Sequence, residues 1–203
     1  MDKLKIKVDK KIFVFLLVLM IVGITMGSIL VTILNSSDKN LTIEYINDFV
    51  NNVKDNKLDY LFVLKNNLFS NLSYIILIWL LGISVIGLPI MIIMFFSKSF
   101  ILGFSIGAVL ETFKAKGIIF SLVYVFPGQV INLLFLLLLM MYAMSFSFKL
   151  IYVILKKQSL DFKLVMNRYF KIFLLVLIVN LLMTLYDTFL MPKLIKLIIP
   201  FIM

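Results

Sequence analysis

Long apolar runs dominate the pattern along this chain. Four of them, residues 12–34, 72–96, 117–148 and 172–191, carry at most one charged residue each. A helix needs about 20 apolar residues to cross the roughly 30 Å hydrocarbon core of a bilayer, and every run reaches that length. The pattern therefore predicts an all-α fold, a polytopic integral membrane helix bundle that forms a single membrane domain over residues 1–203.

The first run is long for a cleaved signal peptide, whose apolar region usually has about 7–15 residues. Residues 12–34 exceed that length, and Asn35-Ser36-Ser37-Asp38 follows without an Ala-x-Ala-like site. We therefore interpret this run as an uncleaved first transmembrane helix.

The central region, residues 72–148, contains two proline sites, Gly87-Leu88-Pro89 and Pro127-Gly128. Proline removes a backbone donor and kinks or ends a helix. As one helix, residues 117–148 would measure about 48 Å, so we expect Pro127-Gly128 to kink or divide this run. Residues 99–113 are short for a crossing, so a third span and a re-entrant segment are both open for the path of residues 97–127.

Residues 35–71 form the longest polar stretch, with four lysines and five acids. Apolar residues recur in it at helical spacing, which predicts two amphipathic helices. Such helices either lie on the membrane surface or form a docking platform for a partner. The candidate partner-binding residues are Ile43, Ile46, Val50, Leu61 and Phe62.

The distribution of lysines predicts the topology. Residues 1–11 and 149–171 are strongly basic, whereas residues 35–71 are near neutral. Positively charged flanks stay in the cytoplasm, so the first two segments should be cytoplasmic and the third extracytoplasmic. With three crossings between residues 72 and 148, this gives about five spans, a cytoplasmic N-terminus and an extracytoplasmic C-terminus after the tail 192–203.

Composition supports a membrane protein and excludes several kinds of chemistry. The chain is 63% apolar and 15% charged, which is typical of membrane proteins. Its net charge of +10 comes from lysines, with Arg168 as the single arginine, so we expect no nucleic-acid partner. Without cysteine or histidine, there is no thiol nucleophile, imidazole base or His/Cys metal site. We expect no catalytic residues, cofactor or metal, and hence no enzyme.

Polar residues are sparse inside the predicted spans. The ionisable ones are expected near span ends: Lys98, Glu111, Lys114, Lys116 and Asp187. A proton relay usually places acids or histidines near the midplane. For Gln129, Asn132 and Asn180 we favour interhelical hydrogen bonds over substrate binding.

Two Gly-x-x-x-Gly pairs, Gly23 with Gly27 and Gly103 with Gly107, lie in apolar segments. Glycines at this spacing let another helix approach closely. The sequence does not say which helix that is.

One stretch carries a specific resemblance. Trp79-Leu-Leu-Gly82-Ile-Ser84-Val-Ile-Gly87-Leu-Pro89 resembles the signature of the stage II sporulation protein M (SpoIIM) family. The similarity continues through Gly103-Phe104 with Gly107, Val125-Phe126-Pro127 with Gln129, and Phe146 to Ile151. The family-motif residues carried over are Trp79, Gly82, Ser84, Gly87, Pro89, Gly103, Gly107 and Pro127.

The resemblance implies a non-enzymatic role in endospore formation. A SpoIIM-like protein is expected at the cell membrane, on the mother-cell side of the sporulation septum. There it would anchor SpoIIP-like and SpoIID-like peptidoglycan hydrolases during engulfment. The remaining partner is the lipid bilayer, and the sequence is also compatible with a homo-oligomer.

The alternative function is a permease-like subunit of an ATP-binding-cassette-type transporter. Glu111 and Gly117 have the spacing of the Glu-Ala-Ala-x-x-x-Gly loop of such permeases, with Thr112 and Phe113 in place of the alanines. That loop must face the cytoplasm, whereas the predicted topology places it outside.

Overall fold

The structure is a computed structural model that describes residues 10–156 and 162–202. Every element in these ranges is helical, which confirms the predicted all-α fold. The predicted basic N-terminus falls largely on residues 1–9, and part of the predicted basic loop on 157–161; both segments lie outside the described residues.

The described helices follow one another with short connections. They are α1 (Lys10–Ile33), α2 (Ser36–Lys54), α3 (Tyr60–Gly82), α4 (Gly87–Phe113), η1 (Lys114–Lys116), α5 (Gly117–Tyr124), η2 (Phe126–Val130), α6 (Ile131–Lys156), α7 (Phe162–Leu185), η3 (Tyr186–Leu190) and α8 (Met191–Ile202). Five helical stretches in the described part of the chain are long and apolar enough to cross a membrane. This agrees with the predicted membrane bundle.

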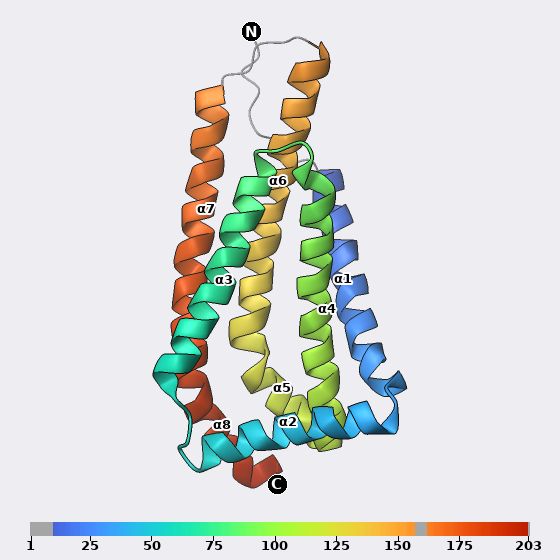
Figure 1. Cartoon of the computed structure of the whole chain (residues 1–203), viewed down its shortest axis with the longest axis vertical. Helices are drawn as coiled ribbons and strands as arrows, with labels where there is room; N and C mark the ends of the chain where they lie inside the picture. The colour runs from blue at the N-terminus through green and yellow to red at the C-terminus, as the bar shows by residue number, and fades with distance from the viewer. Residues whose placement is uncertain (1–9, 157–161, 203) are drawn as a thin grey trace.

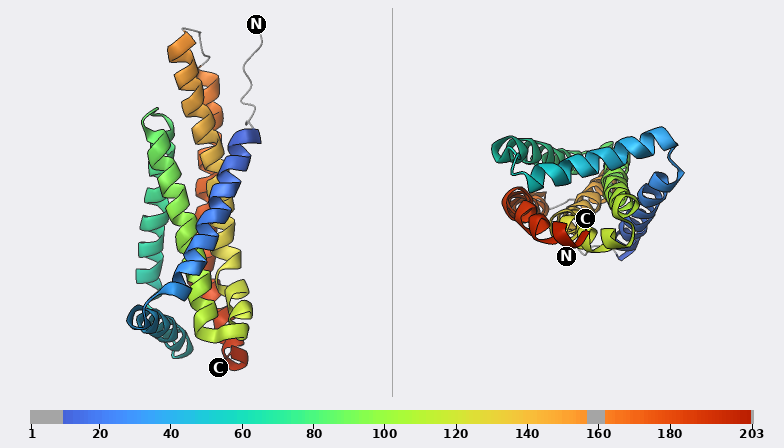
Figure 2. Two further views of the ribbon diagram at one scale, coloured as in Figure 1. Left: turned by 90° about the vertical axis from the view of Figure 1, so that its right-hand side faces the viewer. Right: turned by 90° about the horizontal axis from the view of Figure 1, so that it is seen from below.

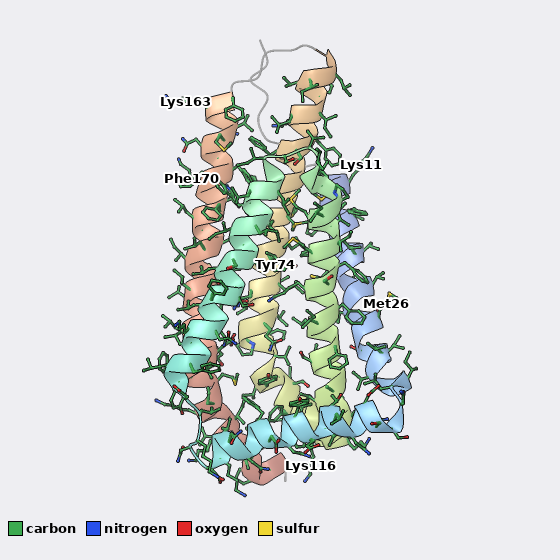
Figure 3. All side chains as sticks on the ribbon, viewed as in Figure 1. Lys11, Met26, Tyr74, Lys116, Lys163 and Phe170 are labelled. Carbon is green, nitrogen blue, oxygen red and sulfur yellow. The ribbon has the colours of Figure 1, made fainter. Side chains whose placement is uncertain are left out.

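The five long helices run lengthwise, and α2 lies across one end of them (Figure 1). We call this end, which also holds α5, α8 and the C-terminus, the α2 end. The opposite end, which we call the turn end, holds the connection between α3 and α4 (Figures 1 and 2). Lys11 and Lys163 lie at the turn end and Lys116 lies at the α2 end (Figure 3).

The limits of the second and third spans differ from the prediction. The sequence pattern placed spans at 72–96 and 99–113, but the chain turns between Gly82 and Gly87 instead. The α3 helix begins at Tyr60 because the Asp59 side chain caps it, accepting hydrogen bonds from the backbone N–H groups of Leu61 and Phe62 (3.1 Å each). The α4 helix then continues unbroken to Phe113, so the alternative of a re-entrant segment at 99–113 is wrong.

Pro89 lies in the first turn of α4, where a missing backbone donor costs nothing. Thus Gly87-Leu88-Pro89 begins a helix instead of kinking one. Pro127-Gly128 does divide its run as expected, into the short helix α5 and the long helix α6, with a π-helical turn, η2, between them.

The last third of the chain is more helical than its charge pattern suggested. The segment 149–171, predicted as a basic loop, mostly extends α6 to Lys156 and begins α7 at Phe162. The predicted last span, 172–191, occupies the second half of α7 and the π-helical turn η3. The predicted tail is the helix α8, which buries Met191, Ile195 and Ile199 at i, i+4 and i+8.

The two Gly-x-x-x-Gly pairs face each other across α1 and α4. A Cβ atom on Gly27 would overlap the carbonyl oxygen of Phe100, and one on Gly103 would overlap that of Ile24. Ser28 Oγ also donates a hydrogen bond to the Gly103 carbonyl oxygen (3.0 Å). The α1–α4 contact is the most extensive between any two elements of the described structure, so the glycines set the closest helix packing in the bundle.

We predict that Gly27→Leu destabilises the purified protein by about 1–3 kcal/mol or more, the usual cost of overpacking. The added side chain has no room against the α4 backbone. The measurement is the thermal unfolding midpoint in detergent. The matched control is Met26→Leu on the neighbouring residue, which is 52% exposed. Equal midpoints for the two variants would show that α1 and α4 do not meet through these glycines.

Candidate functional site

The family-motif residues of α3 and α4 gather at the turn between these helices. Trp79 and Gly82 end α3, Ser84 lies in the turn, and Gly87 begins α4. A Cβ atom on Gly87 would overlap the Leu81 carbonyl oxygen, so glycine permits the tight return of the chain. The signature therefore encodes the turn.

Ser147 of α6 fixes this turn to the bundle. Its side chain is fully buried, and its hydroxyl donates to the carbonyl oxygens of Gly82 (2.7 Å) and Ser84 (3.3 Å). Helix ends leave carbonyl groups without intrahelical partners. The hydroxyl of Ser147 satisfies such groups at the end of α3.

Tyr169 of α7 makes the second attachment. Its hydroxyl donates to the Trp79 carbonyl oxygen (2.9 Å), and its ring stacks on Phe146 and Trp79 with centroid distances of 5.3 and 6.2 Å. A Cβ atom on Gly82 would overlap the Tyr169 hydroxyl. The motif thus joins α3, α6 and α7 at the turn end, and its residues serve packing there.

The other family-motif residues lie elsewhere. Gly103 and Gly107 contact α1, as described above. Pro127 lies in η2, where a Cβ atom on the adjacent Gly128 would overlap the carboxylate of Asp187. The structure therefore divides the motif residues among the turn, the α1–α4 contact and the η2–η3 contact.

The apolar stripe of α2 packs on the bundle itself. Val50 (1% exposed) and Val53 (3%) are buried with Val109, Phe120 and Ile195. This corrects the expectation for Val50, because a buried side chain is not accessible to a partner. Ile46 also packs partly against this cluster. The stripe has the period expected for helix burial, and helices α4, α5 and α8 cover it.

The remaining predicted partner-binding residues are more accessible. Ile43 is half-buried, while Leu61 (76% exposed) and Phe62 (66%) protrude from the first turn of α3. The structure brings Ile43, Ile46 and Val50 together on α2 and leaves Leu61 and Phe62 on a separate element.

The outer face of α2 was missed by the sequence analysis. It consists of Leu41, Glu44, Tyr45 and Asp48, all exposed, with Tyr45 at 77%. Their spacing of i, i+3, i+4 and i+7 is the signal for one helix face. A search for apolar stripes alone passes over it because two of the four residues are acidic.

Polar contacts hold α2 and the loop after it to the bundle. We call this helix and loop the α2 layer. Lys39 of α2 pairs with Glu111 of α4 at 3.0 Å, and Lys196 of α8 donates to Asn56 Oδ1 at 2.9 Å. At the end of α2, the hydrogen bond from Lys57 lowers the pKa of Asp55. Such exposed contacts add little stability, but with the buried stripe they fix the orientation of α2.

Polar residues within the spans lie in different surroundings. Asn180 donates to Asn132 Oδ1 (3.3 Å) between α7 and α6, as predicted. Lys98, predicted near a span end, instead lies in the middle of α4. Glu111 and Asp187 belong to different parts of the molecule, since Glu111 contacts Lys39 and Lys114 while Asp187 lies against Gly128.

Comparison with known proteins is consistent with these features. A family model described as stage II sporulation protein M matches residues 16–192. The chain belongs to the stage II sporulation protein M family. The match runs from Leu16 within α1 to Pro192 at the start of α8, and so includes the turn, the glycine contact and α2. No curated protein and no solved structure shows significant similarity to the chain.

For this SpoIIM family member we predict that Ser147→Ala lowers stability by about 1–3 kcal/mol, because it leaves buried carbonyl groups at the turn without a donor. The matched control is Ser145→Ala on the same helix, since Ser145 donates to the Met141 carbonyl oxygen of its own helix (2.7 Å) and not to the turn. Chemical unfolding in mixed micelles measures both variants. A loss for Ser145→Ala as large as that for Ser147→Ala would contradict the role of the turn.

Proposed function

We propose that this protein is a non-enzymatic membrane scaffold that anchors and localises peptidoglycan hydrolases at the septal membrane during engulfment. SpoIIP-like and SpoIID-like hydrolases are the proposed partners. Family membership supports the sporulation context. The single structural observation that carries the proposal is the α2 layer, a helix fixed across one end of the bundle with its outer face exposed.

The outer face of α2 suits a protein partner. Tyr45 is 77% exposed, and tyrosine is among the residues that contribute most at interfaces. Glu44 and Asp48 flank it with negative charge, which favours a basic partner surface. Confinement of partners to one membrane further raises their effective concentration without additional contacts.

The proposed location requires the α2 end to be extracytoplasmic. The described parts of the two most basic segments, residues 10–11, 149–156 and 162–171, belong to helix ends at the opposite end. Under the positive-inside rule this supports a cytoplasmic turn end. A permease-like function would require the reverse orientation, because Glu111, in the last turn of α4, pairs with Lys39 of α2 and so lies at the α2 end.

We therefore predict that a cysteine at Asn52 reacts with an impermeant maleimide in intact cells, whereas a cysteine at Lys163 reacts only after permeabilisation. Both residues are exposed and lie at opposite ends, and the chain has no native cysteine. A cysteine at Lys114 should behave like the one at Asn52. Labelling of the Lys163 position alone would reverse the orientation and support the permease-like alternative.

For the docking face, we predict that Leu41→Ser combined with Tyr45→Ser reduces co-purification of both hydrolases at least tenfold, while insertion and stability are unchanged. Co-purification from cross-linked membranes measures this. The matched control is Leu61→Ser combined with Phe62→Ser, a pair on α3 that is also more than half exposed.

The two pairs of substitutions distinguish the candidate surfaces. Loss of partners only with the α3 pair would move the docking site to the start of α3. Wild-type recovery with both pairs would overturn docking at the α2 end. Substitution of Val50 is unsuitable as a test, because Val50→Ser would disturb the buried cluster beneath α2.

A further inference from the structure

A cavity of about 420 Å³, which we call the polar cavity for the charged and amide side chains in its wall, lies between the spanning helices and extends to the α2 end. The α3 and α4 helices diverge from their turn toward α2 (Figure 1), and both of them line the cavity. Residues of η2, α6 and η3 also line it, and residues of α2, α5 and α8 line it at the α2 end. Its polar lining includes Asn67, Asn71, Lys98, Gln129, Asn132 and Asp187. Cavities of this size are typical of small-molecule sites.

Lys98 lies deep in this cavity. It is eleven residues from Gly87 and fifteen from Phe113 along α4, or about 16 and 22 Å at 1.5 Å per residue. The ammonium group is therefore carried near the middle of a spanning helix. Ionisable residues at that depth are costly and usually mark a functional site.

The ammonium group of Lys98 can donate further hydrogen bonds to a ligand. It donates one hydrogen bond to Asn71 Oδ1 (3.2 Å) and lies 5.4 Å from the centre of the Tyr74 ring. An ammonium has three donors. Tyr74, labelled in Figure 3, also donates its hydroxyl hydrogen to the Met94 carbonyl oxygen, which ties α3 to α4 on the turn side of Lys98.

Asp187 provides the opposite charge from another wall. It lies in the π-helical turn η3 and faces Gly128 of the π-helical turn η2. Its Oδ1 atom is buried and has no hydrogen-bond partner among the described residues. Single π-helical turns occur frequently at functional sites, and here two of them place a carboxylate at the cavity.

Lys98 and Asp187 line the same cavity, yet they are absent from the ion pairs within 4.0 Å in the described part of the chain. A ligand with only negative charge would leave Asp187 uncompensated, and one with only positive charge would leave Lys98 uncompensated. Buried charges require partners. A ligand that carries both charges compensates both Lys98 and Asp187.

We propose that this cavity binds a zwitterion with a phosphate and a primary ammonium group, the chemistry of an ethanolamine phosphate lipid headgroup. The phosphate contacts Lys98, the ammonium contacts Asp187, and the amides of Asn67, Gln129 and Asn132 complete the hydrogen bonding.

A lipid source is favoured by the apolar surface beside the cavity. Ile101 lines it and is 58% exposed, and Ile93, two turns earlier on α4, is 65% exposed. These residues offer an apolar surface for acyl chains. Binding at this site is independent of the proposed docking of hydrolases at the outer face of α2.

The test uses the full chain in detergent with added phosphatidylethanolamine, phosphatidylglycerol or phosphatidylcholine, and binding is measured by native mass spectrometry and by the shift in thermal midpoint. We expect phosphatidylethanolamine to bind at least tenfold more tightly than the other two. Phosphatidylglycerol lacks the ammonium, and the quaternary ammonium of phosphatidylcholine donates no hydrogen bond. Soluble glycerophosphoethanolamine tests whether the ligand is a free phosphate compound instead of a lipid. If it raises the thermal midpoint at a lower concentration than phosphatidylethanolamine does, the natural ligand is the soluble compound and the lipid assignment is wrong.

Lys98→Gln and Asp187→Asn should each abolish the preference for phosphatidylethanolamine. The matched controls, Lys114→Gln and Asp38→Asn, remove exposed charges and should retain it. Equal affinity for the three lipids, or wild-type preference in both cavity variants, would overturn the proposal.

A second measurement does not depend on removal of either charge. Ser105 is half-buried and lines the cavity, so Ser105→Cys introduces a thiol whose reaction rate with a small maleimide reports occupancy. Phosphatidylethanolamine should slow this reaction at least tenfold relative to phosphatidylglycerol. The same rate in both lipids would contradict occupancy of the cavity.

Discussion

The close contact between α1 and α4 is the constraint on which the rest of the structure depends. Gly27 and Gly103 place backbone against backbone, where a single added methyl group would overlap a carbonyl oxygen. In a bilayer, apolar side chains gain little from leaving lipid, so helices associate through packing and polar contacts instead. The glycine contact and the Ser28 hydrogen bond supply both.

The position of α2 follows from this contact. Only two residues, Leu34 and Asn35, separate α1 from α2, so the end of α1 determines where α2 crosses the bundle. The buried stripe of α2 and the Lys39–Glu111 pair then hold it beneath α4. At the other end, Ser147 and Tyr169 fix the α3–α4 turn to α6 and α7. Fixed at the turn, α3 and α4 separate toward α2 and enclose the polar cavity.

Much of this architecture is predictable from sequence, because apolar length dictates membrane-spanning helices. The five spans, the division at Pro127-Gly128 and the involvement of both glycine pairs in close packing follow from the pattern of residues alone. The family signature is also recognisable, although its function in forming a turn requires the structure. Hydropathy cannot show that Gly87-Leu88-Pro89 begins a helix, because proline both starts and breaks helices.

The differences between the predicted and the observed positions of polar residues have a common physical cause. The sequence pattern placed Asn67 and Asn71 in the polar segment 35–71 and Lys98 near a span end, because polar residues usually leave the membrane. In the structure they lie within α3 and α4 and line an internal cavity. Composition along the chain cannot distinguish a polar residue that faces water outside the membrane from one that faces a cavity within it. The burial of Val50 is a similar case, since an apolar stripe does not reveal what covers it.

Cross-linking between α2 and α4 tests directly whether the glycine contact positions α2. Cysteines replace Lys39 and Glu111, whose charged groups pair at 3.0 Å, and a short bifunctional thiol reagent is added to membranes. We expect efficient cross-linking with wild-type α1, and its loss when Gly27 is changed to Leu in a chain that still inserts. Equal cross-linking in both backgrounds would contradict the claim and show that α2 is held independently of the α1–α4 contact.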